Sequence, residues 1–141
     1  MKTAFLAITV AALSLPIAAA NLSIDDDVRV LSINGERVAH YADHVPLTDG
    51  KQILFVQYEA LFDYSSEDYE IVRSPVQVIR FTANADDNYH IGVPGGHRFD
   101  RDRARDFAKA PSFLLVDDQR FAVQHQSLSR DAALSQMLRE Y

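Results

Sequence analysis

The sequence predicts a mainly β protein, an antiparallel β-sandwich or open barrel of six to seven short strands. Apolar runs rich in β-branched residues recur along the chain, and turn signals separate them every eight to twelve residues. A short helix near residues 100–109 and an amphipathic helix at about 129–141 complete the expected fold. A length of 141 residues suits one such domain.

The first twenty residues have the composition of a secretory signal peptide. Lys2 supplies a positive start, residues 4–15 are almost wholly apolar, and Ala18–Ala20 offers small side chains to a signal peptidase. We expect cleavage after Ala20, which leaves a β-rich domain over residues 21–141; an uncleaved anchor is the alternative. No later segment approaches the roughly 20 apolar residues of a membrane-spanning helix. The sequence therefore predicts a periplasmic protein without stable membrane insertion after signal cleavage.

The first predicted hairpin is signalled by its turn. The β-branched run Val28–Ile33 leads directly into Asn34 and Gly35, the strongest short hairpin signal in a sequence. Glu36–Val38 is then the returning strand. Residues Ala39–Leu47 are expected to form a loop.

The strand predicted over Lys51–Glu59 is the most regular of the chain. Its Ile53–Val56 run is apolar on both faces, which predicts a central position in the sheet. The acidic and serine-containing stretch Ala60–Val72 is expected to be a long exposed connection. Pro75 then introduces a strand over Val76–Ala83, at a position where its missing N–H group costs least.

The second half of the chain continues the β pattern around one short helix. Strands are expected at Tyr89–Val93, Ser112–Val116 and Arg120–Gln124, with a helix over Asp100–Lys109 that ends before Pro111.

The last predicted element is an amphipathic helix that begins after Ser129, a favourable N-cap residue. Leu134, Met137, Leu138 and Tyr141 follow the spacing of one helical face. We expect this face to dock on the sheet.

The sequence contains no recognisable catalytic or metal-binding pattern, so we expect a protein that is not an enzyme and binds no cofactor. The chain has no cysteine, and none of its serines lies in a Gly-x-Ser-x-Gly motif. His40 and His44 are four residues apart, but nearby Pro46 favours exposed loop residues over a metal site. Asp25–Asp27 and Asp86–Asn88 lack the spaced pattern of a calcium loop, so acidic turns are favoured.

The charge pattern argues against nucleic acid as a partner, so we expect none. Asp and Glu number 20 against 14 Lys and Arg, whereas neutralising phosphates requires clustered cations. The basic run Arg98–Asp106 alternates with acids and is expected to form a salt-bridged surface helix. Gly92–Gly96 lacks the remaining residues of a phosphate loop and is expected to be a turn. Six aromatic residues, several of them in predicted loops, could together form a binding surface: Tyr41, Phe55, Tyr58, Phe62, Tyr64 and Tyr69.

The order of these segments resembles one known family. The residues that carry the resemblance are Leu22-x-Ile24, Val28-x-Val30-Leu31-x-Ile33-Asn34-Gly35-x-x-Val38, Gly50–Val56, Ser74-Pro75 leading to Phe81, and Phe107-Ala108-x-Ala110-Pro111. Over about Leu22–Val123 the chain resembles the YccT-like family, small periplasmic proteins of Gram-negative bacteria without an assigned function. Members usually extend further beyond the last strand, so a function of that region would not transfer.

The resemblance implies a periplasmic protein and, for some members, inhibition of curli assembly; it implies no catalytic residues. We therefore expect an exported, non-enzymatic accessory protein that binds a protein partner in the cell envelope through an exposed strand edge. Such a protein would restrain assembly of an extracellular, curli-like amyloid subunit. The alternative is an envelope carbohydrate- or small-ligand-binding module that uses loop tyrosines. An uncovered strand would favour the first function and an open aromatic cleft the second.

Overall fold

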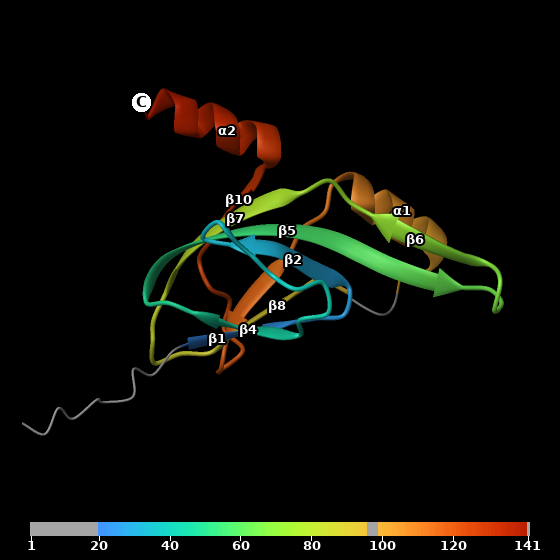
Figure 1. Ribbon diagram of the computed structural model, residues 1–141, viewed down its shortest axis with the longest axis horizontal. Helices are drawn as coiled ribbons and strands as arrows, with labels where there is room; N and C mark the ends of the chain where they lie inside the picture. Colours follow the sequence, from blue (N-terminus) through green and yellow to red (C-terminus); the bar gives the residue numbers. More distant parts are fainter. Residues whose placement is uncertain (1–19, 96–98, 141) are drawn as a thin grey trace, which may run out of the picture.

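The computed structural model describes residues 20–95 and 99–140, which fold into two β-sheets and two helices (Figure 1). The mainly β class is confirmed, and the two sheets make the architecture sandwich-like. Ten strands occur in the described part of the chain, more than the six to seven predicted. Apart from Ala20, the predicted signal peptide lies outside the described residues.

The smaller sheet has four strands in the order β4-β1-β8-β9. Their bounds are β1, Ala20–Ile24; β4, His44–Leu47; β8, Tyr89–Gly92; and β9, Leu114–Asp117. Two corrections to the prediction concern this sheet. The segment Ala39–Leu47, predicted to be a loop, ends in strand β4. β4 forms because it pairs with β1, and the sequence analysis did not predict β1 as a strand. In addition, β1 and β8 run parallel, so the fold is not wholly antiparallel.

The larger sheet has six strands in the order β10-β7-β5-β2-β3, with β6 also beside β5. Their bounds are β2, Val28–Ile33; β3, Glu36–Arg37; β5, Gly50–Asp63; β6, Tyr69–Arg73; β7, Gln77–Ala83; and β10, Gln126–Ser129. The predicted hairpin between β2 and β3 is confirmed. Its central residues Asn34 and Gly35 have φ angles of 52° and 84°, as a tight two-residue turn requires.

The central position of β5 is confirmed, since it pairs with β2, β6 and β7. Its two apolar faces are nevertheless not equally buried. Leu54 and Val56 are fully buried between the sheets, whereas Ile53 and Phe55 keep 38% and 40% of their surface exposed. The second sheet covers only one face of the larger sheet, so the other face, called the outer face below, stays partly open.

The predicted exposed connection over Ala60–Val72 is wrong. β5 continues to Asp63, and β6 returns beside it after a turn in which the Tyr64 N–H donates to the Asp68 carbonyl at 2.9 Å. Ala60 of β5 and its cross-strand partner Val72 of β6 are both buried. This burial of one face explains why an acidic segment nevertheless forms strands. The resulting two-stranded ribbon, residues 59–73, projects from one end of the larger sheet (Figure 1).

The predicted strand over Arg120–Gln124 is also wrong. Arg120 adopts a positive φ of 67°, and Asp117 closes a tight turn by accepting the N–H of Phe121 through Oδ1 at 3.0 Å. Only an isolated bridge between Ala122 and Val116 follows. The chain then crosses to the larger sheet, where β10 pairs with β7.

Helix α1, Arg101–Lys109, confirms the predicted helix, and Asp100 caps it by accepting the Arg103 N–H. It packs against β6 and β5 and buries Ala104 and Ala108. Tyr58, at the centre of this end of the core, makes an edge-to-face contact with Phe107 at 4.8 Å between ring centroids. Burial, with the charge of Asp27 as a second cause, raises the pKa of Tyr58 to about 12.

Helix α2, Arg130–Arg139, begins after Ser129 as predicted, but its predicted docking face is wrong. Leu134, Met137 and Leu138 are 51%, 46% and 76% exposed, and Ala133 is the buried residue of the helix; Tyr141 lies outside the described residues. The helix extends above β10 and β7, away from the core between the sheets (Figure 1). No helix within the described residues has the length and apolar character needed to cross a membrane.

Candidate functional site

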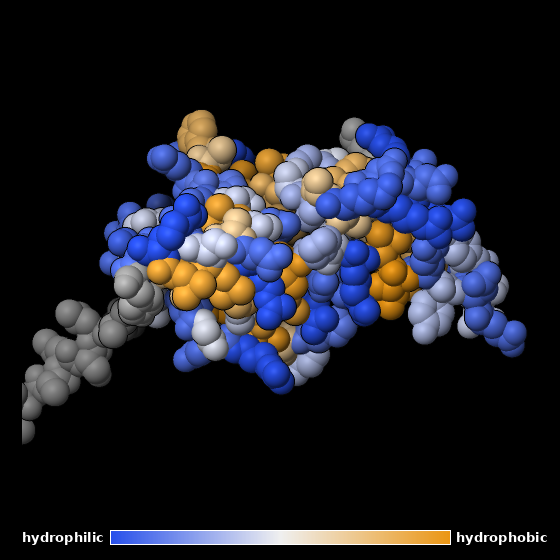
Figure 2. Space-filling view, turned by 90° about the horizontal axis from the view of Figure 1, so that it is seen from above, coloured by the Kyte–Doolittle hydropathy of each residue, from blue (hydrophilic) through white to orange (hydrophobic). Residues whose placement is uncertain are grey.

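The most exposed apolar surface on a strand pair is found on the β5–β6 ribbon. Leu61 and Ile71 lie directly opposite each other in the register and are 60% and 40% exposed. Tyr69, two residues before Ile71 and therefore on the same face, is 63% exposed. Seen from above, apolar patches interrupt a largely hydrophilic surface of the molecule (Figure 2). The outer face of the ribbon is therefore a candidate contact surface.

The outer edge of β6 also has unpaired backbone groups. The Ser74 N–H donates to the Tyr58 carbonyl, whereas the Glu59 N–H donates to the Asp27 carbonyl on the opposite side of β5. Since successive residues of an antiparallel strand direct their backbone groups to alternate sides, Ala60 bonds to Val72 across the ribbon. The N–H and C=O groups of Tyr69, Ile71 and Arg73 consequently point away from β5. No described strand pairs with them.

Helix α1 supports the opposite face of the ribbon. The Arg105 guanidinium forms a two-pronged ion pair with Glu70 of β6, with Nε–Oε1 at 2.9 Å and Nη2–Oε2 at 2.6 Å. Arg101 lies over the ring of Tyr64 at 5.4 Å from its centroid. The predicted salt-bridged surface helix is thus confirmed for its described part, and these contacts join the helix to the ribbon.

Beside the open edge, β6 and α1 form a shallow groove of about 450 Å³. Val72, Arg73 and Pro75 line one wall, and Arg105 and Lys109 line the other. A strand added to β6 would therefore meet solvent on its outer face and this groove on its inner face.

The base of the ribbon is fixed by a charge network around Glu59. Its Oε2 accepts Arg73 Nε at 3.0 Å, and its Oε1 lies 3.2 Å from His40 Nε2. Burial alone would raise the pKa of Glu59, but the hydrogen bonds from Arg73 and His40 outweigh it and lower the pKa below its ordinary value. The network links β5 to β6 and to the segment before β4.

The structure does not bring the sequence-derived metal candidates together. His40 contacts Glu59, whereas His44 contacts Asp43 through Nδ1 at 2.6 Å. In the described ranges, no three His, Cys, Asp or Glu side chains converge in a way that could hold a metal ion. The acidic segments at 25–27 and 86–88 lie at turns, with Asp87 N–H bonded to the Asn84 carbonyl.

The candidate aromatic residues are dispersed rather than gathered in one cleft. Tyr58 is buried in the core, Tyr64 and Tyr69 flank the turn of the ribbon, and Tyr41, 91% exposed, lies between β3 and β4. The exposed ring of Phe55 is on the outer face of the larger sheet.

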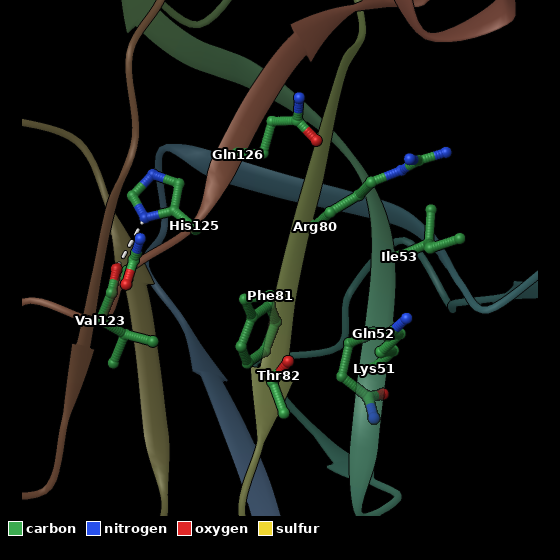
Figure 3. Close-up of a pocket in the computed structure, with 10 residues that line it drawn as sticks. Lys51, Gln52, Ile53, Arg80, Phe81, Thr82, Val123, His125 and Gln126 are labelled. Atoms are coloured by element: carbon green, nitrogen blue, oxygen red, sulfur yellow. Dashed lines mark hydrogen bonds between the residues drawn. The ribbon is translucent and has the colours of Figure 1, made fainter. Parts of the chain in front are cut away.

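A second groove lies at the other end of the larger sheet, where β10 leaves β7 (Figure 3). It encloses about 730 Å³, and its lining includes Lys51, Arg80, Thr82, His125 and Gln126 but no acidic residue.

Sequence reasoning missed the ribbon because it read 60–72 as a connection. The signal that could have found it is the alternation of apolar residues through Ala60 and Phe62, followed by Ile71 and Val72 after a Ser-Ser turn. No such signal could show that β6 lies at an edge, because strand order depends on contacts between distant segments.

Comparison with known proteins assigns a family but no activity. No curated protein and no solved structure shows significant similarity to the chain. A family model described as an uncharacterised protein conserved in bacteria matches residues 21–140, which includes both sheets and both helices. The chain therefore belongs to this uncharacterised bacterial family, DUF2057.

Proposed function

We propose that this protein is an exported, non-enzymatic accessory protein of the bacterial cell envelope that binds an extended segment of a protein partner along β6. The observation that carries the proposal is the exposed strand edge at Tyr69, Ile71 and Arg73. In strand addition the main chain supplies the affinity, and alternate side chains supply specificity. The paired, exposed Leu61 and Ile71 favour a partner with apolar residues on the outer face.

Three of the other sheet edges, at β3, β4 and β9, are less suited to strand addition. β4 contains Pro46, which cannot donate to a ladder, and β3 consists of only two residues. β9 is partly covered by the bridge from Ala122. Proteins commonly protect their edges by such means. β6 has neither a proline nor a covering strand within the described residues.

The resemblance to the YccT-like family supports a narrower form of the proposal, in which the partner is a curli-like amyloid subunit. A growing amyloid end presents an unpaired strand, and pairing it with β6 would stop further addition. The composition of residues 1–20 supports export to the periplasm, where such subunits pass.

A carbohydrate- or small-ligand-binding module remains the alternative function. Its support is the pair of exposed tyrosines near the ribbon turn, Tyr64 and Tyr69. Strand addition is favoured because none of the three grooves described for this structure is lined by a tyrosine.

Two matched proline variants test the proposal. Ile71→Pro removes an N–H group from the open edge of β6. Asp63→Pro removes an N–H group from the opposite edge of the ribbon, at a residue outside the proposed apolar contact. Neither removes a hydrogen bond between β5 and β6. The fluorescence of thioflavin during fibre formation by a purified curli-type subunit is the readout, with circular dichroism to confirm folding.

We expect the unmodified protein to lengthen the lag at substoichiometric ratios, Asp63→Pro to retain this effect and Ile71→Pro to lose it. Equal lag times with and without the protein would contradict the amyloid form of the proposal. Backbone amide shifts at Tyr69–Arg73 report strand addition independently, and their absence with this subunit would contradict binding at β6.

A further inference from the structure

A second open backbone position lies on β7, at the opposite end of the larger sheet from the ribbon turn. Ile53 exchanges hydrogen bonds with Asn34 on the β2 side: its carbonyl accepts the Asn34 N–H, and its N–H donates to Asn34 Oδ1, both at 2.8 Å. By alternation, Gln52 faces β7 and bonds to Phe81. The N–H and C=O of Thr82 therefore point away from β5.

These groups have no partner within the described residues. β10 pairs with β7 only over Gln77–Arg80. The two residues that follow on β7, Phe81 and Thr82, therefore have no partner on β10. Before Gln126 the chain diverges towards the smaller sheet, where the Val123 N–H donates to the Leu115 carbonyl at 2.9 Å. Thr82 is exposed, and the groove of about 730 Å³ lies between it and the diverging segment (Figure 3).

Two cations stand beside this open position on the outer face of the sheet. Lys51 pairs directly with Thr82, and Arg80 pairs with Ile53, so the two cations are diagonal neighbours. Figure 3 shows the Arg80 side chain crossing from β7 towards Ile53, on the side away from His125. Neither Lys51 nor Arg80 has an ion-pair partner in the described part of the chain, and the buried Nε of Arg80 has no hydrogen-bond acceptor there.

Unpaired cations are unexpected in this protein, because its formal net charge is −6. A buried guanidinium nitrogen without an acceptor is costly unless a ligand or ordered water supplies one. None of the ten residues that line the groove is acidic. Charge complementarity therefore favours a ligand that brings a carboxylate.

We propose that this groove binds an extended peptide segment which pairs with the Thr82 backbone and places a glutamate opposite Thr82 on the outer face. The segment continues the line of β10 and exchanges both backbone hydrogen bonds with Thr82. The site is distinct from the β6 edge and does not depend on the function proposed for it.

The geometry favours glutamate over aspartate. Neighbouring strands lie about 4.8 Å apart, so the added residue and Lys51 are two strand spacings apart, about 10 Å. Thr82, the residue between them, is small. A glutamate side chain can extend across it towards the long side chains of Lys51 and Arg80, whereas an aspartate side chain is one methylene shorter.

The test uses the full chain and three heptapeptides of sequence Thr-Val-Thr-x-Thr-Val-Thr, with Glu, Asp or Gln at the central position. Amide chemical shifts of Thr82 report backbone pairing, and titration of the same shifts gives the affinity. We expect the Glu peptide to shift Thr82 and to bind about fivefold more tightly than the Gln peptide at low salt. The Asp peptide should lie between them.

Lys51→Gln should remove most of the difference between the Glu and Gln peptides. Arg37→Gln, an equal charge change on exposed β3 of the same sheet, should leave it intact. Equal affinities for Glu and Gln in the unmodified protein would overturn the proposal. Free glutarate that binds as tightly as the Glu peptide, without the Thr82 shift, would instead identify a small-anion site and overturn strand pairing here.

Discussion

Asn34 and Gln52 join their side-chain amides in a hydrogen bond, with Asn34 Nδ2 donating to Gln52 Oε1 at 2.8 Å. Gln52 is only 1% exposed, and its Nε2 donates to the carbonyls of Thr48 and Gly50 at 2.7 and 3.1 Å. One buried amide therefore connects the turn between β2 and β3 to the turn that begins β5.

Replacing this glutamine by an apolar residue of similar length should destabilise the domain. Gln52→Leu leaves the amide of Asn34 and two carbonyls without their partner, which costs about 1–3 kcal/mol of unfolding free energy. Chemical denaturation measures the loss. Gln119→Leu, on an exposed turn, is the matched control and should change the unfolding free energy by less than about 0.5 kcal/mol. Equal effects of the two variants would show that the buried amide has no special role.

The turn itself depends on a residue that tolerates positive φ. Gly35 has a φ of 84°, a region that β-branched residues rarely adopt, although no neighbouring atom would block an added Cβ. Gly35→Val should therefore destabilise the domain by about 1 kcal/mol or more through backbone strain alone. Glu36→Val, one residue later on the exposed β3, serves as the control. An unchanged melting temperature for Gly35→Val would contradict the strained-turn argument.

Local signals of this kind explain which parts of the fold were predictable. Asn34-Gly35, the cap at Asp100 and the cap at Ser129 each act within a few residues, so the sequence located the hairpin and both helices. The parallel pairing of Leu22 with Tyr89 joins segments far apart in the chain and leaves no local pattern. In the same way, the open edge at Ile71 follows from strand order, which no single segment contains.

For the terminal helix, the spacing of apolar residues predicted the helix but not which of its faces is buried. The spacing of Leu134, Met137 and Leu138 defines an apolar face, but it does not show that another surface covers that face. Since all three are largely exposed, changing them together to alanine should alter the unfolding free energy by less than about 0.5 kcal/mol.

Ala133→Asp, at the buried position of the helix, should instead reduce the helix content, because it places a charge against the sheet. Thermal denaturation followed at 222 nm distinguishes the two. A loss of several kcal/mol in the triple variant would support docking of the helix.

The charge network at the base of the ribbon should make stability depend on acid pH. Glu59 is the acceptor for Arg73 and His40, and its pKa in the folded protein lies below the ordinary value of 4.5. A lowered carboxyl pKa stabilises the folded state at pH values above the unfolded-state pKa. This contribution is lost as the pH falls through the folded-state pKa.

Glu59→Gln should therefore lower the unfolding free energy by about 1–2 kcal/mol near neutral pH. The difference from the unmodified protein should shrink as the pH falls below the ordinary pKa of 4.5 and through the lowered pKa of folded Glu59. Unfolding free energies measured across this range test the argument, with Glu67→Gln on the exposed ribbon turn as the control for the same charge change. If the cost of Glu59→Gln were constant with pH, packing of the side chain rather than its charge would hold the base of the ribbon.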